Sequence, residues 1–131
     1  MRVAFTTTDG QTIDQHFGHA AHFHVWEVGP DSAAFVERVS AITRADDEED
    51  KTNARANAIA DCTIVYTVAI GGPAAAKLVA RRIHPMKTNV EVPVEEIVAK
   101  LQAVLRGNPP PWLRKAMNGG VLPAPAGDVE A

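Results

Sequence analysis

Cysteine is almost missing from this sequence of 131 residues, which contains only Cys62. A single cysteine excludes an internal disulfide and an all-cysteine zinc or iron-sulfur site built by one chain. Long apolar runs are also missing, because no stretch approaches the roughly 20 residues that a membrane span requires. The N-terminus turns polar too soon for a secretory signal. We therefore expect a cytoplasmic protein that does not bind membranes.

A strong excess of one charge is the third absence. The chain has 13 basic and 16 acidic residues and a net charge of −3, which argues against a nucleic-acid-binding surface. Because 46% of the residues are hydrophobic, the chain can bury one sizeable core, and its length predicts a single domain. We expect this domain to span residues 1–117, with Trp112 and Leu113 docking its last segment. Many prolines and glycines from Asn118 onward predict a disordered tail.

The connection between Thr6 and Phe23 is the most unusual stretch of the chain. It joins two apolar runs that each predict a strand. Neighbouring strands are usually joined by two to about five residues, and this connection is roughly three times longer. It also contains three histidines: His16, His19 and His22. We therefore predict that it is a functional loop.

The order of apolar patterns predicts an α/β fold. Five strands are expected, at residues 1–7, 23–28, 35–42, 63–70 and 86–90, and the first three form an antiparallel meander. Helices are expected at residues 52–60, 74–82 and 93–106. The acidic block at residues 46–50 predicts a solvated, mobile connector.

The right-handed crossover rule places the fourth strand beside the first and gives the strand order 3-2-1-4-5, with strand two antiparallel to the others. This three-layer arrangement of a five-stranded mixed sheet with flanking helices is ribonuclease H-like. Its crevice lies at the carboxyl ends of strands one and four. We expect the loop at residues 6–21 and the turn at residues 71–73 to open onto this edge.

The turn Gly71-Gly72-Pro73 leaves two interpretations open. Pro73 suits the first helical turn, and two glycines leave backbone amides uncovered, so the junction suits an anion. It is neither a P-loop nor a dinucleotide fingerprint, because the lysine and the glycine spacing of those motifs are missing. A tight strand-to-helix turn without a ligand explains the same residues equally well.

Three blocks resemble a known family. DGQTIDQHFGHAAHF resembles the signature loop of the nitrogenase iron-molybdenum cofactor assembly proteins, and VYTVAIGGPAAAKLV resembles their second block. LRGNPPPWLRKAM is similar to the ending typical of the NifX branch, and the match runs to about Met117. The resemblance implies a non-catalytic carrier that binds an iron-sulfur precursor of the cofactor as cargo. It would pass this cargo between two assembly proteins, a cluster donor and an acceptor scaffold.

Within this resemblance, His16 matches the cluster-binding histidine of the family and is the predicted metal ligand. Backbone amides of the glycine pair and nearby threonine hydroxyls would contact sulfides or the anionic rim of the cargo. The predicted cargo-binding residues are His16, Phe17, Gly18, Thr7, Thr8, Gly71 and Gly72.

The remaining histidines and the cysteine are weaker candidates for ligands of the cargo. His19 and His22 share a face if the segment between them is helical, but the family pattern requires neither. His24 lies inside a strand and His84 lies away from the crevice, so we interpret both as structural. Cys62 begins the fourth strand, roughly 25 Å from the crevice, and is expected to be a buried small side chain.

Two other functions are open. The first is an enzyme of metal-assisted phosphate chemistry that uses Asp9 with the Gly71-Gly72 anion seat. Such sites need several clustered carboxylates, and only Asp9 and Asp14 are near. The second is a binding module that has lost the cluster.

Overall fold

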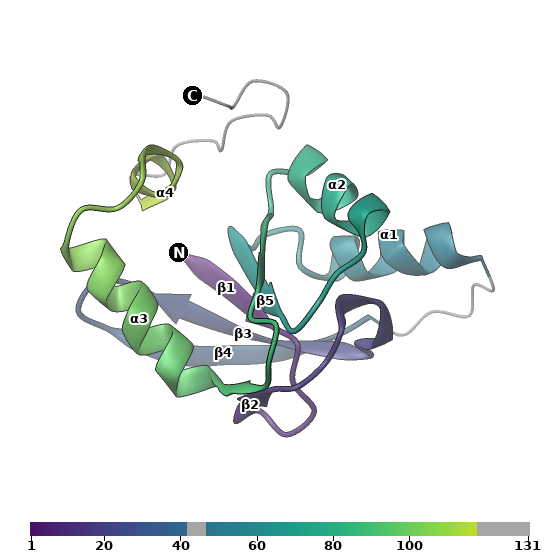
Figure 1. Cartoon of the computed structure of the whole chain (residues 1–131), viewed down its shortest axis with the longest axis horizontal. Coiled ribbons are helices and arrows are strands. Elements are labelled where there is room, and N and C mark those ends of the chain that lie inside the picture. The colour runs from purple at the N-terminus through teal and green to yellow at the C-terminus, as the bar shows by residue number, and fades with distance from the viewer. Residues whose placement is uncertain (42–46, 118–131) are drawn as a thin grey trace.

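The computed structural model describes residues 1–41 and 47–117 and is built on a five-stranded mixed sheet (Figure 1). The strands of this sheet are β1 (Arg2–Phe5), β3 (His22–Val28), β4 (Ala33–Ser40), β5 (Ile64–Thr67) and β6 (His84–Lys87). A separate two-stranded sheet pairs β2 (Thr12–Ile13) with β7 (Val92–Pro93).

The strands lie in the order β4-β3-β1-β5-β6. β3 is antiparallel to both β1 and β4, whereas β5 is parallel to β1 and β6. A five-stranded mixed sheet with flanking helices was predicted and is confirmed. Because β1 and β5 are parallel neighbours, the loops that follow them leave the sheet at the same edge.

Helices cover both faces of the sheet, so the fold has three layers (Figure 1). α1 (Glu48–Ala58) and α2 (Gly72–Ala80) lie on one side, while α3 (Val94–Arg106) and α4 (Pro111–Met117) lie on the other. Side chains of a strand alternate between faces, so Ala4 packs with the core beneath α1 and α2, and Val3 and Phe5 pack beneath α3. No helix in the described ranges is long and apolar enough to cross a membrane.

α3 follows its sequence signals, whereas α4 was not predicted as a helix, because prolines and glycines are frequent around it. α3 buries one apolar stripe, carries Glu95 and Glu96 in its first turn and ends at Gly107, as predicted. Leu113 of α4 is buried, and Trp112 packs against the same core, so the predicted docking of this segment is confirmed. The predicted tail from Asn118 lies outside the described residues, as do residues 42–46.

One prediction about local structure was wrong, and two short strands were not predicted. α1 begins at Glu48, four residues before the predicted start at Thr52, so most of the acidic block is helical rather than a connector. Carboxylates suit the positive end of a helix dipole, and Glu49 pairs with Lys77 of α2 at 3.1 Å. β2 and β7 were not predicted, because strands of two residues are too short for a hydrophobic period.

Candidate functional site

The long loop between β1 and β3 folds back onto the chain that follows β5. The Phe17 N–H donates a hydrogen bond to the Ala69 carbonyl at 2.9 Å, and the Val68 N–H donates to the Gln15 carbonyl at 3.0 Å. These two bonds flank His16, which forms an isolated parallel bridge with Ala69. Since Gly71 follows Ala69 by two residues, the two predicted loops meet at one edge of the sheet.

Two buried threonines hold this junction. The Gln15 carbonyl lies 2.9 Å from the Thr67 hydroxyl and 3.1 Å from the Thr6 hydroxyl. Both side chains are fully buried, and a buried hydroxyl needs a partner. This role of the threonines was not predicted from the sequence. The signal in the sequence was Thr67 at the end of the apolar run of β5. A hydroxyl buried in such a run needs a hydrogen-bond partner within the protein.

The loop exposes a pair of imidazoles. A 3₁₀ turn over Phe17–His19 begins directly after His16, and side chains three residues apart overlap in such a turn. Accordingly, the exposed rings of His16 and His19 stack with centroids 5.6 Å apart and planes inclined by 21°. Neutral imidazole is the commonest protein metal ligand, so this surface offers two nitrogen donors.

The end of the turn is also fixed. Arg55 of α1 donates from Nε to the Ala20 carbonyl at 3.1 Å. No sequence signal indicated this contact, because α1 and the loop are joined only by the tertiary fold. The backbone before His16 is therefore bonded to β5 and to the segment that follows it, and the backbone after His16 is bonded to that same segment and to α1.

Phe17 was predicted to bind cargo, but its side chain is fully buried. Its ring packs against Phe23 with centroids 5.7 Å apart, so it anchors the loop to the core, and its ring has no surface to offer to a ligand. Gly18 is exposed, and a Cβ at this position would have no atom within 4 Å. The backbone next to His16 is thus open to solvent.

The two predicted threonine contacts are already used within the loop. Thr7 is fully buried, and its hydroxyl donates to Asp9 at 3.2 Å while accepting the Gly10 N–H at 3.0 Å. Its assignment as a cargo contact was therefore wrong, since no cargo can reach it. The exposed Thr8 donates its hydroxyl to Asp14, which also accepts the Thr8 N–H at 3.0 Å.

Asp9 stabilises the tip of the loop. Its carboxylate accepts the N–H groups of Gln11 at 2.9 Å and Thr12 at 3.0 Å. These two bonds, which favour the charged form, hold the pKa of Asp9 below its ordinary value. The enclosed Gly10 has a φ of 81°, a conformation that favours glycine.

The glycine pair stands where an anion could approach a helix. Gly71 caps α2 without a side-chain hydrogen bond, and the first turn carries no acidic residue. Gly71 and Gly72 are exposed, and a Cβ on either would meet no atom within 4 Å. The positive end of the helix dipole is therefore open to solvent beside the His16 loop.

The other histidines are partly buried. His24 packs its ring against Phe35 with centroids 5.2 Å apart, and His84 stacks on Trp112 at 3.9 Å. Burial is the largest cause that lowers the pKa of both imidazoles, in agreement with the structural interpretation. His22 is half-buried on β3, with its ring centroid 6.1 Å from that of His24, and it does not share the exposed turn of His16.

Cys62 is 4% exposed and belongs to the core beneath α1 and α2. Burial, followed by the nearby Asp61 carboxylate, raises the pKa of its thiol to about 12. It precedes β5, whereas His16 lies beside the residues that follow this strand. The prediction that Cys62 is a buried side chain at the start of this strand, away from His16, is confirmed. Within residues 1–41 and 47–117, no group of three or more His, Cys, Asp or Glu side chains could hold a metal ion.

Comparison with known proteins gives consistent results. The family model described as dinitrogenase iron-molybdenum cofactor matches residues 1–104. The chain is 45% identical to Protein NifX of Herbaspirillum seropedicae, over 92% of this chain and 84% of that protein. It is 39% identical to Protein NifY of Azotobacter vinelandii, over 89% of this chain and 48% of that protein.

The fold is similar to the crystal structure of PH0822, with a TM-score of 0.63 and 21% identity over 79% of this chain and 91% of that chain. Identity this low supports the mixed α/β fold alone. The sequence matches are stronger, because they extend over most of this chain and most of the NifX relative. The chain therefore belongs to the dinitrogenase iron-molybdenum cofactor family.

Proposed function

We propose that this protein is a non-catalytic carrier that binds an iron-sulfur precursor of the iron-molybdenum cofactor and transfers it between assembly proteins. The observation that carries the proposal is the exposed imidazole of His16, held between two backbone bonds to the segment after β5. A ligand on a fixed backbone needs little ordering when the cargo arrives, which favours binding.

The chemistry follows from what the cargo brings. A preassembled cluster carries its own sulfides and negative charge, so the protein needs to supply few ligands. His16 would coordinate one iron, and the amides of Gly71 and Gly72 would contact the anionic rim at the start of α2. His19 would add a second nitrogen donor from the same turn. One or two neutral ligands hold a cluster weakly enough for its release.

The partners are inferred from the relatives. One relative, 30% identical over 84% of this chain, is the FeMo cofactor biosynthesis protein NifB of Bradyrhizobium diazoefficiens, and the match covers 25% of that protein. We infer a cluster donor and an acceptor scaffold among such assembly proteins, acting in the cytoplasm. We also infer that the strand order belongs to a ribonuclease H-like topology.

The phosphate-chemistry alternative has less support. It requires carboxylates that are free to bind a metal ion, whereas Asp9 accepts three hydrogen bonds from its own loop and Asp14 accepts two from Thr8. The exposed histidine pair has no role in that mechanism. These contacts favour the carrier.

The proposal is tested by binding under anaerobic conditions. The full chain is mixed with an isolated iron-sulfur precursor and passed through a gel-filtration column, and visible absorption in the protein peak measures the bound cluster. We expect His16→Ala to lose most of this absorption, about tenfold or more. His19→Ala should lose less, and Gln11→Ala, an exposed change in the same loop, should lose none.

Circular dichroism should show that all three variants fold, because the side chains of these residues are exposed. If the wild-type chain elutes colourless, the protein is a binding module without a cluster. If His16→Ala binds as the wild type does, His16 has no part in the mechanism. Magnesium-dependent turnover of a nucleotide would support the enzyme instead.

A further inference from the structure

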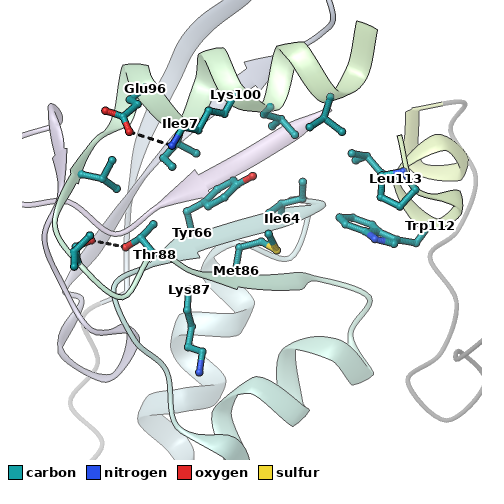
Figure 2. Close-up of a pocket in the computed structure, with 15 residues that line it drawn as sticks. Ile64, Tyr66, Met86, Lys87, Thr88, Glu96, Ile97, Lys100, Trp112 and Leu113 are labelled. Carbon is teal, nitrogen blue, oxygen red and sulfur yellow. Dashed lines mark hydrogen bonds and ion pairs between the residues drawn. The ribbon is translucent and has the colours of Figure 1, made fainter. Parts of the chain in front are cut away.

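A large cavity lies on the opposite side of the sheet from α1 and α2. It has a volume of about 520 Å³, is lined by residues of β5, β6, α3 and α4, and opens to solvent (Figure 2). Its walls are mostly apolar, and the side chains that matter here are Ile64, Tyr66, Met86, Ile97, Leu101 and Trp112. Pockets of about 300–1,000 Å³ with such walls commonly hold small molecules.

One polar group is directed into this cavity. The ring of Tyr66 forms part of the wall, and its hydroxyl points inward between α3 and α4 (Figure 2). Tyr66 as a residue is 8% exposed, and its hydroxyl makes no hydrogen bond within residues 1–41 and 47–117, so it is free to donate to a molecule in the cavity. A tyrosine side chain combines an apolar ring with one hydroxyl that can form a hydrogen bond. Burial raises the pKa of Tyr66 to about 12, so the hydroxyl stays protonated and can donate.

The charges around the cavity do not favour a charged ligand. Lys100 and Glu96 neutralise each other along α3, with Nζ and Oε2 3.2 Å apart. The Lys87 side chain points away from the cavity (Figure 2). Placing an unpaired charge among apolar walls would be costly. A neutral ligand therefore fits best.

Two aromatic side chains set the shape of the ligand. Trp112 of α4 lies at one end of the cavity with its other face stacked on His84, and Tyr66 lies on the sheet. Aromatic rings prefer stacked or edge-to-face contacts with other rings. The thioether of Met86 adds an adaptable contact between them.

From these features we propose that the cavity binds a neutral, mainly apolar aromatic molecule with one hydrogen-bond acceptor, which the Tyr66 hydroxyl recognises. This site is separate from the His16 surface, which lies beside the residues that follow β5. The proposal does not depend on the cluster-carrier function. It predicts that the full chain distinguishes two ring compounds that differ only in an acceptor.

The test uses α-tetralone, a bicyclic ketone, and tetralin, which lacks the carbonyl. Each is titrated into the ¹⁵N-labelled full chain, and the shift of the Trp112 indole N–H signal reports binding at the cavity. We expect α-tetralone to bind about five- to tenfold more tightly than tetralin, since one hydrogen bond is worth about 1 kcal/mol. In Tyr66→Phe this difference should disappear, while tetralin binding should be unchanged.

A filled-cavity variant separates binding in the cavity from binding elsewhere. Ile97→Trp places a large ring in the cavity and should abolish binding of both probes, whereas Ala99→Trp, an exposed position on the same helix, should not. Equal binding of the two probes to the wild type would overturn the proposal, as would no binding by either. Nuclear Overhauser contacts between Trp112 and residues 118–131 would also overturn it, because the chain itself would then fill the cavity. If Ile97→Trp does not fold, the affinities of the two probes for the wild type and for Tyr66→Phe still test the proposal.

Discussion

The position of His16 is set by its neighbours and not by its own side chain. Gln15 and Phe17 are bonded to the segment after β5, and Phe17 is buried, so the imidazole between them must face solvent. The sequence singled out His16 as a candidate ligand through the family's signature loop, and this role stays a prediction. The sequence could not show that Phe17 serves the core, because a buried and a ligand-contacting phenylalanine look alike in a loop sequence.

Cys62 differs from His16, because its side chain is buried although a thiolate is a common metal ligand. With a thiol pKa of about 12, only about one thiol in ten thousand is ionised at pH 8. We predict that Cys62 in the folded chain reacts with Ellman's reagent at least about a hundredfold more slowly than in urea-unfolded chain. Rapid labelling of the folded chain would contradict the burial. Cys62→Ala should bind the cluster precursor as the wild type does.

Among the elements, β1, β3, β4, β5 and α3 were predictable because each is an apolar run or has a hydrophobic period. β6 begins two residues before its predicted start, and β2 and β7 were not predicted. The loop was predictable only as a long connection. Its internal order depends on contacts distant in sequence: Gln11 accepts the Val94 N–H at 2.8 Å, and Gln15 accepts the bonds from Thr6, Val68 and Thr67. Every residue has a backbone carbonyl, so the residue types in a sequence do not show which carbonyls accept these hydrogen bonds.

Gly10 tests the rigidity of the loop. An added Cβ would lie 2.7 Å from His24 Cε1, at a φ of 81° that disfavours other residues. We predict that Gly10→Ala lowers the free energy of unfolding by about 1–3 kcal/mol. Gly18→Ala, with no atom within 4 Å of its Cβ, should change it by less than about 0.5 kcal/mol. Urea unfolding measures both, and equal effects would contradict the fixed loop.

At the scale of the whole molecule, the sheet separates two surfaces. The His16 loop and the start of α2 lie at the carboxyl ends of β1 and β5, whereas the cavity lies between the other face and the two C-terminal helices. The layered architecture was predictable from the alternation of strands and helices. The cavity was not, because it depends on how far α4 stands from β6, which no local pattern fixes.

The stability of the whole chain should depend on pH through its buried imidazoles. Burial lowers the pKa of His24 and His84 in the folded state, so the unfolded chain binds protons first as the pH falls. Stability is therefore full above the ordinary histidine pKa of about 6.5 and falls as the pH drops below it. We predict a lower urea midpoint at pH 5.5 than at pH 7.5. His84→Gln should reduce this difference without removing it, because His24 remains; an unchanged difference would contradict the role of His84.

The most direct measurement is an anaerobic titration of the isolated iron-sulfur precursor into the wild-type chain and His16→Ala, followed by electron paramagnetic resonance. The carrier proposal predicts that the wild type changes the shape of the cluster signal until about one cluster is bound per chain, because an imidazole replaces a solvent ligand on one iron. The variant should leave the signal as it is in buffer. The same saturable change in His16→Ala would contradict the central claim.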